Sequence, residues 1–293
     1  MRFTEIGQQL RAYRLESGLR AEEIAARLGV SRAALYRYEK GEVIKLDTIQ
    51  RLAELLKISP LSLLGIGVEY YNRPIGYLER IRQVEETADQ ILQVNGALCY
   101  VTTTDSFDHA LAAVFEEASE AAGADRSSAR MAAEQVLGIL AARKRMYSMR
   151  RPGIIAMVPA GRVRDLLEGG IAPGLRVSER TRRMCREVAA TEIEHIAALM
   201  EAEPMGLQFG LVQAPELTGG FEIMRTRDRA ALAMNPFRPD SNPSGAPGVA
   251  MITAADEAIS AHQRIAESHW REATKGAAAA ADVRAMIEAA RLR

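Results

Sequence analysis

The feature that most constrains this chain is the segment Leu28-Gly29-Val30-Ser31, which separates two short amphipathic stretches. Glycine readily adopts the left-handed conformation that ends a helix, so Gly29 marks a helix end. The hydroxyl of Ser31 can accept a hydrogen bond from the free amide groups at the start of the next helix. Ala25 is small enough to let two helices cross closely. We therefore predict two short helices that meet at a sharp turn.

The first 67 residues extend this pattern to five short helices. Their apolar residues recur at three- and four-residue steps, and Gly18 and Gly41 end two of the stripes. Ser59-Pro60 opens the fifth helix, because proline is tolerated at the first helical position. Gly65-Ile66-Gly67 then breaks the pattern. We predict an all-helical domain over residues 1–67, here called the head, and a larger body over residues 68–293.

Residues 19–41 resemble the helix-turn-helix of the Cro and lambda-repressor family, often called XRE-type, and the resemblance covers residues 4–64. The positions that agree with the family are Arg14, Gly18, Leu19, Ile24, Ala25, Leu28, Gly29, Val30, Ser31, Leu35, Glu39, Gly41, Leu52 and Ala53. The resemblance implies a five-helix head that inserts its third helix into the major groove of operator DNA. It also implies an ion pair between Arg14 and Glu39.

The third helix should turn Leu35 and Tyr38 inward and leave Arg32, Ala33, Tyr36 and Arg37 on its other side. Arginine is the commonest specific reader of guanine, and alanine can contact a thymine methyl group. The resemblance assigns base contacts to the positions of Arg32, Ala33 and Arg37. The family's usual Thr-Gln pair is replaced by Arg20-Ala21, so Arg20 is expected on phosphate. The DNA-contacting residues that we predict are Arg20, Ser31, Arg32, Ala33, Tyr36, Arg37 and Lys40.

The body begins with apolar residues that recur at three- and four-residue steps from Leu78 to Val94. This spacing predicts one amphipathic helix within a linker and dimerisation segment over residues 68–96. Two interpretations stay open at this point. The helix either packs on its own domain or pairs two subunits.

Strands and helices are mixed in residues 97–293, which predicts an α/β or α+β domain that senses an effector and forms oligomers. The predicted strands cover residues 97–103, 153–158, 207–213, 219–226, 230–235 and 249–252. The predicted helices cover residues 107–122, 127–148, 177–203, 253–274 and 277–292, with Thr253 as a cap. Turns are expected at Gly219-Gly220 and Arg227-Asp228, and a proline-rich loop at 236–248.

The residues that suggest catalysis do not form a complete site, so we predict no enzyme, no metal and no cofactor. Glu192 and His195 have the spacing of a di-iron helix, but the second such pair that a di-iron site needs is missing. His262 and His269 are expected at the surface or an interface, and Cys185 in the core. Phosphate-cradling glycine loops and a Gly-x-Ser-x-Gly nucleophile motif are absent as well.

Compartment and charge give weaker guidance. Two cysteines exclude a disulfide scaffold and a cysteine-built zinc site, and the sequence contains no apolar run long enough to span a membrane. A cytoplasmic protein is expected. The 38 Lys and Arg balance 38 Asp and Glu over the chain, whereas the head carries 11 against 8, which is compatible with a DNA-binding surface.

Two basic clusters stand out in the body. Arg143, Lys144, Arg145, Arg150 and Arg151 lie near the end of one predicted helix, where positive charge suits the helix dipole. The second cluster, at the start of the 177–203 helix, lies where the dipole disfavours positive charge. Its candidate effector-binding residues are Arg176, Arg180, Arg183 and Arg186, with Arg182 beside them. An anionic effector, the DNA backbone and acidic residues of a second subunit stay open as partners.

The stretch Gly248–Ala273 is similar to the strand–helix ending of phospholipase-D-like sensor domains, which follow some bacterial helix-turn-helix regions. The His-x-Lys motif of that superfamily is absent, so activity is not implied. We expect a cytoplasmic, homodimeric transcription regulator, either a repressor or an activator, with operator DNA and an unidentified small molecule as partners. The alternative is an antitoxin-like or mobile-element repressor whose body binds another protein.

Overall fold

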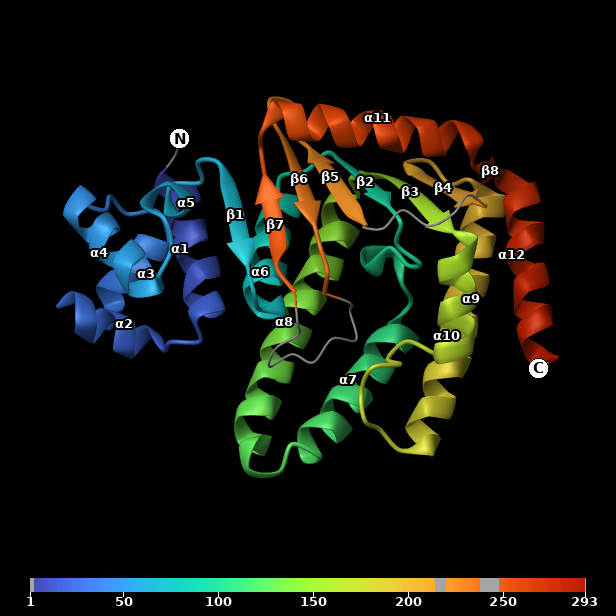
Figure 1. Cartoon of the computed structure of the whole chain (residues 1–293), viewed down its shortest axis with the longest axis horizontal. Coiled ribbons are helices and arrows are strands. Elements are labelled where there is room, and N and C mark those ends of the chain that lie inside the picture. Colours follow the sequence, from blue (N-terminus) through green and yellow to red (C-terminus); the bar gives the residue numbers. More distant parts are fainter. Residues whose placement is uncertain (1–2, 214–219, 238–247, 293) are drawn as a thin grey trace.

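The computed structural model describes residues 3–213, 220–237 and 248–292. Its first five helices form the head, which lies at one end of the molecule (Figure 1). They are α1 (Phe3–Ser17), α2 (Ala21–Leu28), α3 (Arg32–Glu39), α4 (Leu46–Leu56) and α5 (Pro60–Leu63). Gly29 is left-handed at φ 70°, and the Ser31 hydroxyl accepts a hydrogen bond from the amide of Ala34 at 3.1 Å. The predicted turn and its cap are both present.

The body is built on an eight-stranded mixed sheet. Its strands are β1 (Val68–Tyr71), β2 (Gln90–Val94), β3 (Gly153–Pro159), β4 (Leu207–Val212), β5 (Phe221–Arg225), β6 (Ala230–Met234), β7 (Ala250–Thr253) and β8 (Thr274–Lys275). The order across the sheet is β1-β7-β6-β5-β2-β3-β4-β8. Strands β2, β3 and β4 are parallel, and every other pairing is antiparallel. The multidomain prediction of a helical head and a mixed α and β body therefore holds.

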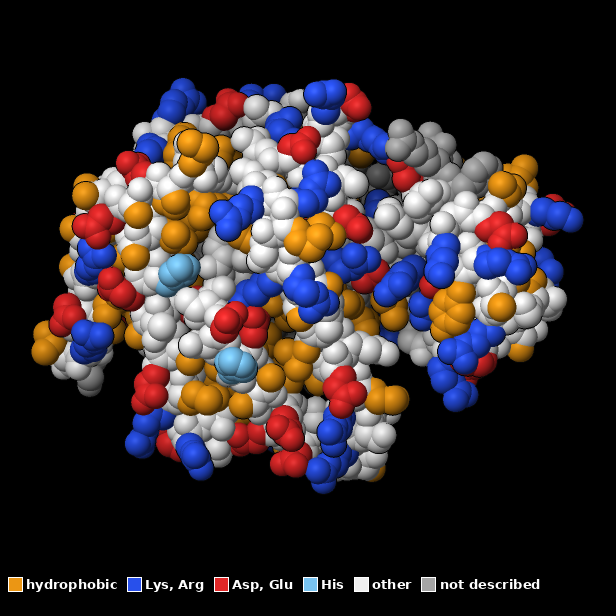
Figure 2. Space-filling model, turned by 180° about the vertical axis from the view of Figure 1, so that it is seen from behind, with side chains coloured by type: hydrophobic (Ala, Val, Ile, Leu, Met, Phe, Trp, Pro, Cys, Tyr) orange, Lys and Arg blue, Asp and Glu red, His pale blue; other side chains and the backbone are white. Residues whose placement is uncertain are grey.

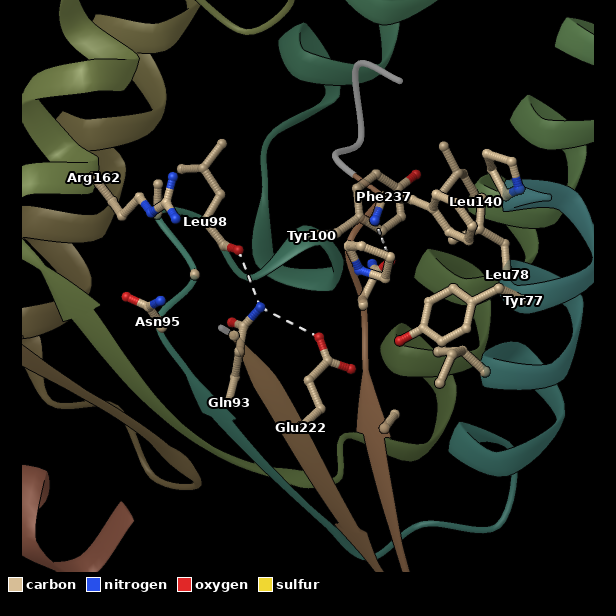
Figure 3. Close-up of a pocket in the computed structure, with 18 of the residues that line it drawn as sticks. Tyr77, Leu78, Gln93, Asn95, Leu98, Tyr100, Leu140, Arg162, Glu222 and Phe237 are labelled. Carbon is tan, nitrogen blue, oxygen red and sulfur yellow. Dashed lines mark hydrogen bonds between the residues drawn. The ribbon is translucent and has the colours of Figure 1, made fainter. Parts of the chain in front are cut away.

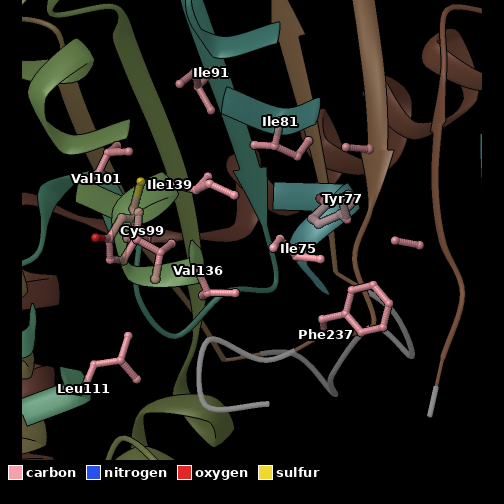
Figure 4. Close-up of a cluster of buried hydrophobic side chains, with 14 of the residues drawn as sticks. Ile75, Tyr77, Ile81, Ile91, Cys99, Val101, Leu111, Val136, Ile139 and Phe237 are labelled. Carbon is pink, nitrogen blue, oxygen red and sulfur yellow. The ribbon is translucent and has the colours of Figure 1, made fainter. Parts of the chain in front are cut away.

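Helices cover both faces of the sheet (Figure 1). They are α6 (Pro74–Glu85), α7 (Asp105–Glu120), α8 (Arg126–Arg150), α9 (Ala160–Gly169), α10 (Glu179–Ala202), α11 (Asp256–Glu272) and α12 (Gly276–Arg291). Alternate residues of β3 divide the core, because successive strand side chains point to opposite faces. Ile154 and Ala156 join the large core, whereas Ile155 and Met157 join a smaller core beneath α11. Figure 4 shows part of the large core, including Ile81 of α6 and Val136 of α8.

The helix predicted from Leu78 to Val94 is wrong in its extent. Helix α6 ends at Glu85, and Ile91 and Val94 belong to β2 in the middle of the sheet. Residues 68–96 therefore do not form one helix, since they contribute two strands and a helix to the body. The apolar side of α6 is covered by its own chain, which agrees with the interpretation that this helix packs on its own domain.

The structure differs from the sequence-based prediction in three further places. Residues 97–103 form a loop with a short 3₁₀ turn instead of a strand, because the hydroxyls of Thr102 and Thr103 bond back to the carbonyls of Cys99 and Tyr100. Helix α9 was not predicted. The capping position of α11 is occupied by Ala255, whereas Thr253 accepts a hydrogen bond from the Ala255 amide.

The predicted features at Gly219 and at residues 238–247 lie outside the described residues. The other predicted helices and strands of residues 105–292 match observed elements within a few residues. The spacing of apolar residues thus predicted a helix or strand correctly where the element was long or lay between clear turns.

The head is attached to the body through α1, which packs along α6. Tyr13 stacks on Tyr71 of β1 with ring centroids 5.2 Å apart. The Glu16 carboxylate accepts hydrogen bonds from the amides of Asn72 and Arg73, at 2.6 and 3.0 Å, at the start of α6. Gly76 allows this approach, because a Cβ atom there would lie 2.7 Å from Cβ of Glu16.

Charged groups buried in the same interface are paired. The Glu79 carboxylate of α6 forms ion pairs with Arg11 of α1 and with Arg82, each at 2.9 Å. Burial disfavours its charge, but Arg82 and Arg11 together lower the pKa of Glu79. Glu69 of β1 binds Arg80 at 2.9 Å and accepts a hydrogen bond from Gln9 at 2.5 Å. The head is therefore fixed to the body by specific contacts as well as by the chain.

Candidate nucleic-acid interface and interior cavity

Helix α3 presents the predicted DNA-contacting side chains on the outside of the head. Leu35 and Ala34 are buried against α1 and α2, and Glu39 is buried at the end of the helix. The exposed residues on the helix and its flanks are Ser31, Arg32, Ala33, Arg37 and Lys40, with Tyr36 half-buried. On the face shown in Figure 2, Lys and Arg side chains gather over the head, whereas the body mixes both signs.

The two candidate base-reading arginines are held by exposed partners. Arg32 lies 2.7 Å from Glu22 and stacks over the ring of Tyr36, and Arg37 lies 2.7 Å from Glu42. Ion pairs of this kind are worth at most about 1 kcal/mol in water. Both guanidinium groups can therefore exchange these carboxylates for DNA.

Arg20 compensates for the missing threonine cap in a way that the sequence did not reveal. Its amide donates to the Glu23 carboxylate at 2.8 Å, and its guanidinium lies 3.1 Å from the same side chain. Glu23 thus caps the start of α2. The guanidinium is exposed at the head surface.

Arg14 and Glu39 form the ion pair that the family resemblance implies. Nε of Arg14 lies 2.5 Å from Oε1 of Glu39, and Nη2 lies 3.1 Å from Oε2. Only 14% of the Arg14 side chain and 5% of the Glu39 side chain are exposed. Burial opposes the charge of Arg14, but the bond to Glu39 raises its pKa. This bidentate pair ties α1 to the end of the recognition helix.

The second candidate site is a cavity of about 490 Å³ in the body, beyond the end of β2 (Figure 3). Its wall combines α6, the loop after β2, α8, α9 and the ends of β5 and β6. The apolar lining includes Tyr77, Leu78, Ile81, Leu98, Tyr100, Phe107, Val136, Leu140, Ile171 and Phe237. This volume is in the range of small-molecule sites. The cavity could not be predicted from the sequence, because its lining residues are scattered from position 74 to 237.

Polar and charged side chains interrupt this lining, and they are Gln93, Asn95, Arg143, Arg162, Asp165, Glu222 and Asn235. The amide of Gln93 donates to Glu222 Oε1 and to the carbonyl of Leu98, both at 3.3 Å. Figure 3 shows the Tyr77 hydroxyl pointing toward Glu222, whereas Asn95 and Arg162 lie on the opposite side. Burial raises the pKa of Glu222 despite the nearby Arg143, and burial also raises the pKa of Tyr77 well above its usual value.

The basic cluster at the end of α8 serves mainly to hold the cavity wall together. Arg143 makes two hydrogen bonds of 2.7 Å to Glu85 of α6, and its guanidinium lies over the ring of Tyr100. Lys144 lies 2.5 Å from Asp108 of α7. Arg150 donates to the carbonyl of Glu86. These contacts join α8 to α6 and α7.

The predicted effector-binding arginines lie elsewhere. Arg176, Arg180 and Arg183 are exposed near the start of α10, and Arg186 pairs with Glu179 at 2.9 Å. The residues that line the cavity include none of these four. The start of α10 already holds an acidic group, since Glu117 of α7 accepts hydrogen bonds from the Ser178 amide and the Thr181 hydroxyl. The structure therefore places these arginines outside the lining of this cavity, with three of the four exposed at the surface.

The other candidates have structural roles. Glu192 accepts the Thr104 amide at 3.0 Å and His195 contacts the carbonyl of Thr102 at 3.1 Å, so both hold the loop beside α7. His262 packs edge-on against Phe221. Burial raises the pKa of Cys99 to about 12, and Cys185 is buried. The described residues contain no group of three potential metal ligands and no helix long and apolar enough to cross a membrane.

Comparison with known proteins gives a family match for the head alone. Residues 5–63 match the family model of a helix-turn-helix domain. No curated protein matches the chain. The match covers the five helices that were predicted from capping residues and apolar spacing, and it ends before β1. The N-terminal part of this protein is therefore a helix-turn-helix domain, which suggests a DNA-binding regulator.

Proposed function

We propose that this protein is a sequence-specific transcription regulator that binds operator DNA through α3 and senses a small molecule in its body. One observation carries the proposal. Helix α6 is shared between the head interface and the cavity. Its residues at positions 76, 79 and 83 face α1, whereas Tyr77, Leu78 and Ile81 line the cavity.

This arrangement supplies a physical route from ligand to DNA. A ligand that repositions α6 acts on α1 through Arg11–Glu79 and through Gln83, whose amide donates to the Gln8 carbonyl at 3.1 Å. Helix α1 is joined in turn to α3 by Arg14–Glu39. Coupling requires only that ligand favours one of two positions of these helices.

We further propose that the protein acts as a homodimer. One recognition helix offers few base contacts, and a genome presents many competing sites. Two heads on paired half-sites, about one helical turn apart or a multiple of it, would supply the missing specificity. Sedimentation of the full chain with and without operator measures this directly.

The first experiment selects preferred duplexes from a random pool with the full chain. Arg32→Ala and Arg37→Ala should then lose preference for the selected sequence more than affinity for scrambled DNA, because a base contact is worth about 1–3 kcal/mol at one base pair. Arg130→Ala is the matched control, since Arg130 is an exposed, ion-paired arginine of α8 in the body. Equal losses on selected and scrambled DNA would reduce both head arginines to phosphate contacts.

A further inference from the structure

We propose that the cavity of the body binds a small organic cation, an amine on an apolar or aromatic framework, with the amine against the carboxylate of Glu222. The inference rests on the proposed function, because it names the class of molecule that the body would sense. It depends, however, on the cavity alone and is tested without DNA.

The charges at the sheet wall of the cavity are unbalanced. Arg143 makes two hydrogen bonds of 2.7 Å to Glu85, and Oε1 of Glu222 accepts a hydrogen bond of 3.3 Å from the neutral amide of Gln93. Two carboxylates thus share the neighbourhood of one guanidinium. Glu222 lines the cavity, and Figure 3 shows the neutral Tyr77 hydroxyl pointing toward its carboxyl group. A half-buried carboxylate whose neighbours at the cavity wall are a neutral amide and a neutral hydroxyl favours a positively charged partner.

The walls around Glu222 suit the remainder of such a ligand. The rings of Tyr77 and Phe237 meet edge to face with centroids 6.2 Å apart, and both line the cavity. Aromatic rings attract cations and also pack against apolar groups. Leu78, Ile81 and Leu140 complete an apolar wall on the side of α6 and α8.

Figure 3 shows Arg162 beside Asn95 on the opposite side of the cavity. Asp165 of the same helix also lines the cavity, so α9 contributes one charge of each sign. The amine is therefore placed against Glu222 and Tyr77 at the sheet wall. The apolar framework then occupies the space between the two sides.

Calorimetry on the full chain tests this with three probes of one shape: 4-phenylbutylamine, 4-phenylbutanol and 4-phenylbutyrate. The amine should bind tightest and the carboxylate weakest. Glu222→Gln retains the shape and an acceptor for Gln93, so it should weaken amine binding at least tenfold and leave alcohol binding nearly unchanged. Glu134→Gln is the control, because Glu134 is an exposed carboxylate of α8 away from the cavity lining.

A second variant tests the location without removing a charge. Leu98→Trp adds bulk from the loop after β2 into the cavity, so it should abolish amine binding while the melting temperature shows that the body is folded. Unchanged amine affinity in Glu222→Gln, retained binding in folded Leu98→Trp, or tightest binding of the carboxylate would each overturn the proposal. The DNA preference is measured in a separate experiment. Amine binding without any DNA sequence preference would refute the proposed regulator but not this site. DNA sequence preference without amine binding would refute this site but not the regulator.

Discussion

Replacing Glu39 by alanine should destabilise the head, because it leaves the Arg14 guanidinium without its bidentate partner. Breaking a buried ion pair costs about 3–5 kcal/mol. Arg14 keeps 14% of its side chain exposed, and its guanidinium lies 5.9 Å from the ring of Tyr36. Partial exposure to water and the nearby Tyr36 ring both compensate in part for the lost carboxylate, so we expect a destabilisation at the lower end of this range, about 3 kcal/mol. For a domain of the size of the head, that corresponds to a melting temperature lower by roughly 12–24 °C.

Thermal and urea unfolding of the full chain, followed by circular dichroism, measure this loss. Glu42→Ala is the matched control in the same head, because Arg37 and Glu42 are 63% and 48% exposed and their pair is worth at most about 1 kcal/mol. The double variant Arg14→Leu with Glu39→Leu should recover most of the stability, since it removes both charges. If Glu39→Ala unfolds like Glu42→Ala, Arg14 and Glu39 do not act as a buried pair.

Two further predictions concern packing and pH. Gly7→Ala should destabilise the head by about 1–3 kcal/mol, because the added Cβ would lie 2.4 Å from the Tyr38 carbonyl oxygen. Gly138→Ala, on the open face of α8, should stabilise the protein by up to about 1 kcal/mol, because alanine favours the helix more than glycine does. The denaturant midpoints of the two variants and the parent measure both effects. The raised pKa of Glu222 means that the unfolded chain releases this proton first, so stability falls as pH rises from about 4.3 to the raised value. Glu222→Gln should therefore match the parent near pH 4 and exceed it in melting temperature near pH 7, and equal melting at both values would contradict the assigned burial.

The head was predictable because its signals are local. Gly29 and Ser31 define a turn through their own backbone conformation and hydrogen bonding, and the apolar spacing on either side needs no distant partner. The predicted α3 residues accordingly lie on one exposed surface. The role of Glu23 as the cap of α2 was missed, although its position three residues after Arg20 is the signal of a capping box.

The start of the body was mispredicted because spacing alone cannot separate a helix from the strand that follows it. Ile91 and Val94 continue the three-residue steps of α6, yet they pair with β3 and β5. The cavity could not be predicted at all. Its decisive contact joins Gln93 to Glu222 across 129 positions of sequence, and only the strand order brings β2 beside β5.

The docking of α1 on α6 also determines how this protein can be recombined with others. Cutting at the glycine-rich boundary near residue 67 would separate Tyr13 from Tyr71 and Glu16 from the amides of Asn72 and Arg73. A chimaera that exchanges whole heads must therefore match the α1 surface of the donor to α6 of the recipient. Grafting only the exposed side chains of α3 leaves this interface intact, and is the shorter way to transfer operator preference.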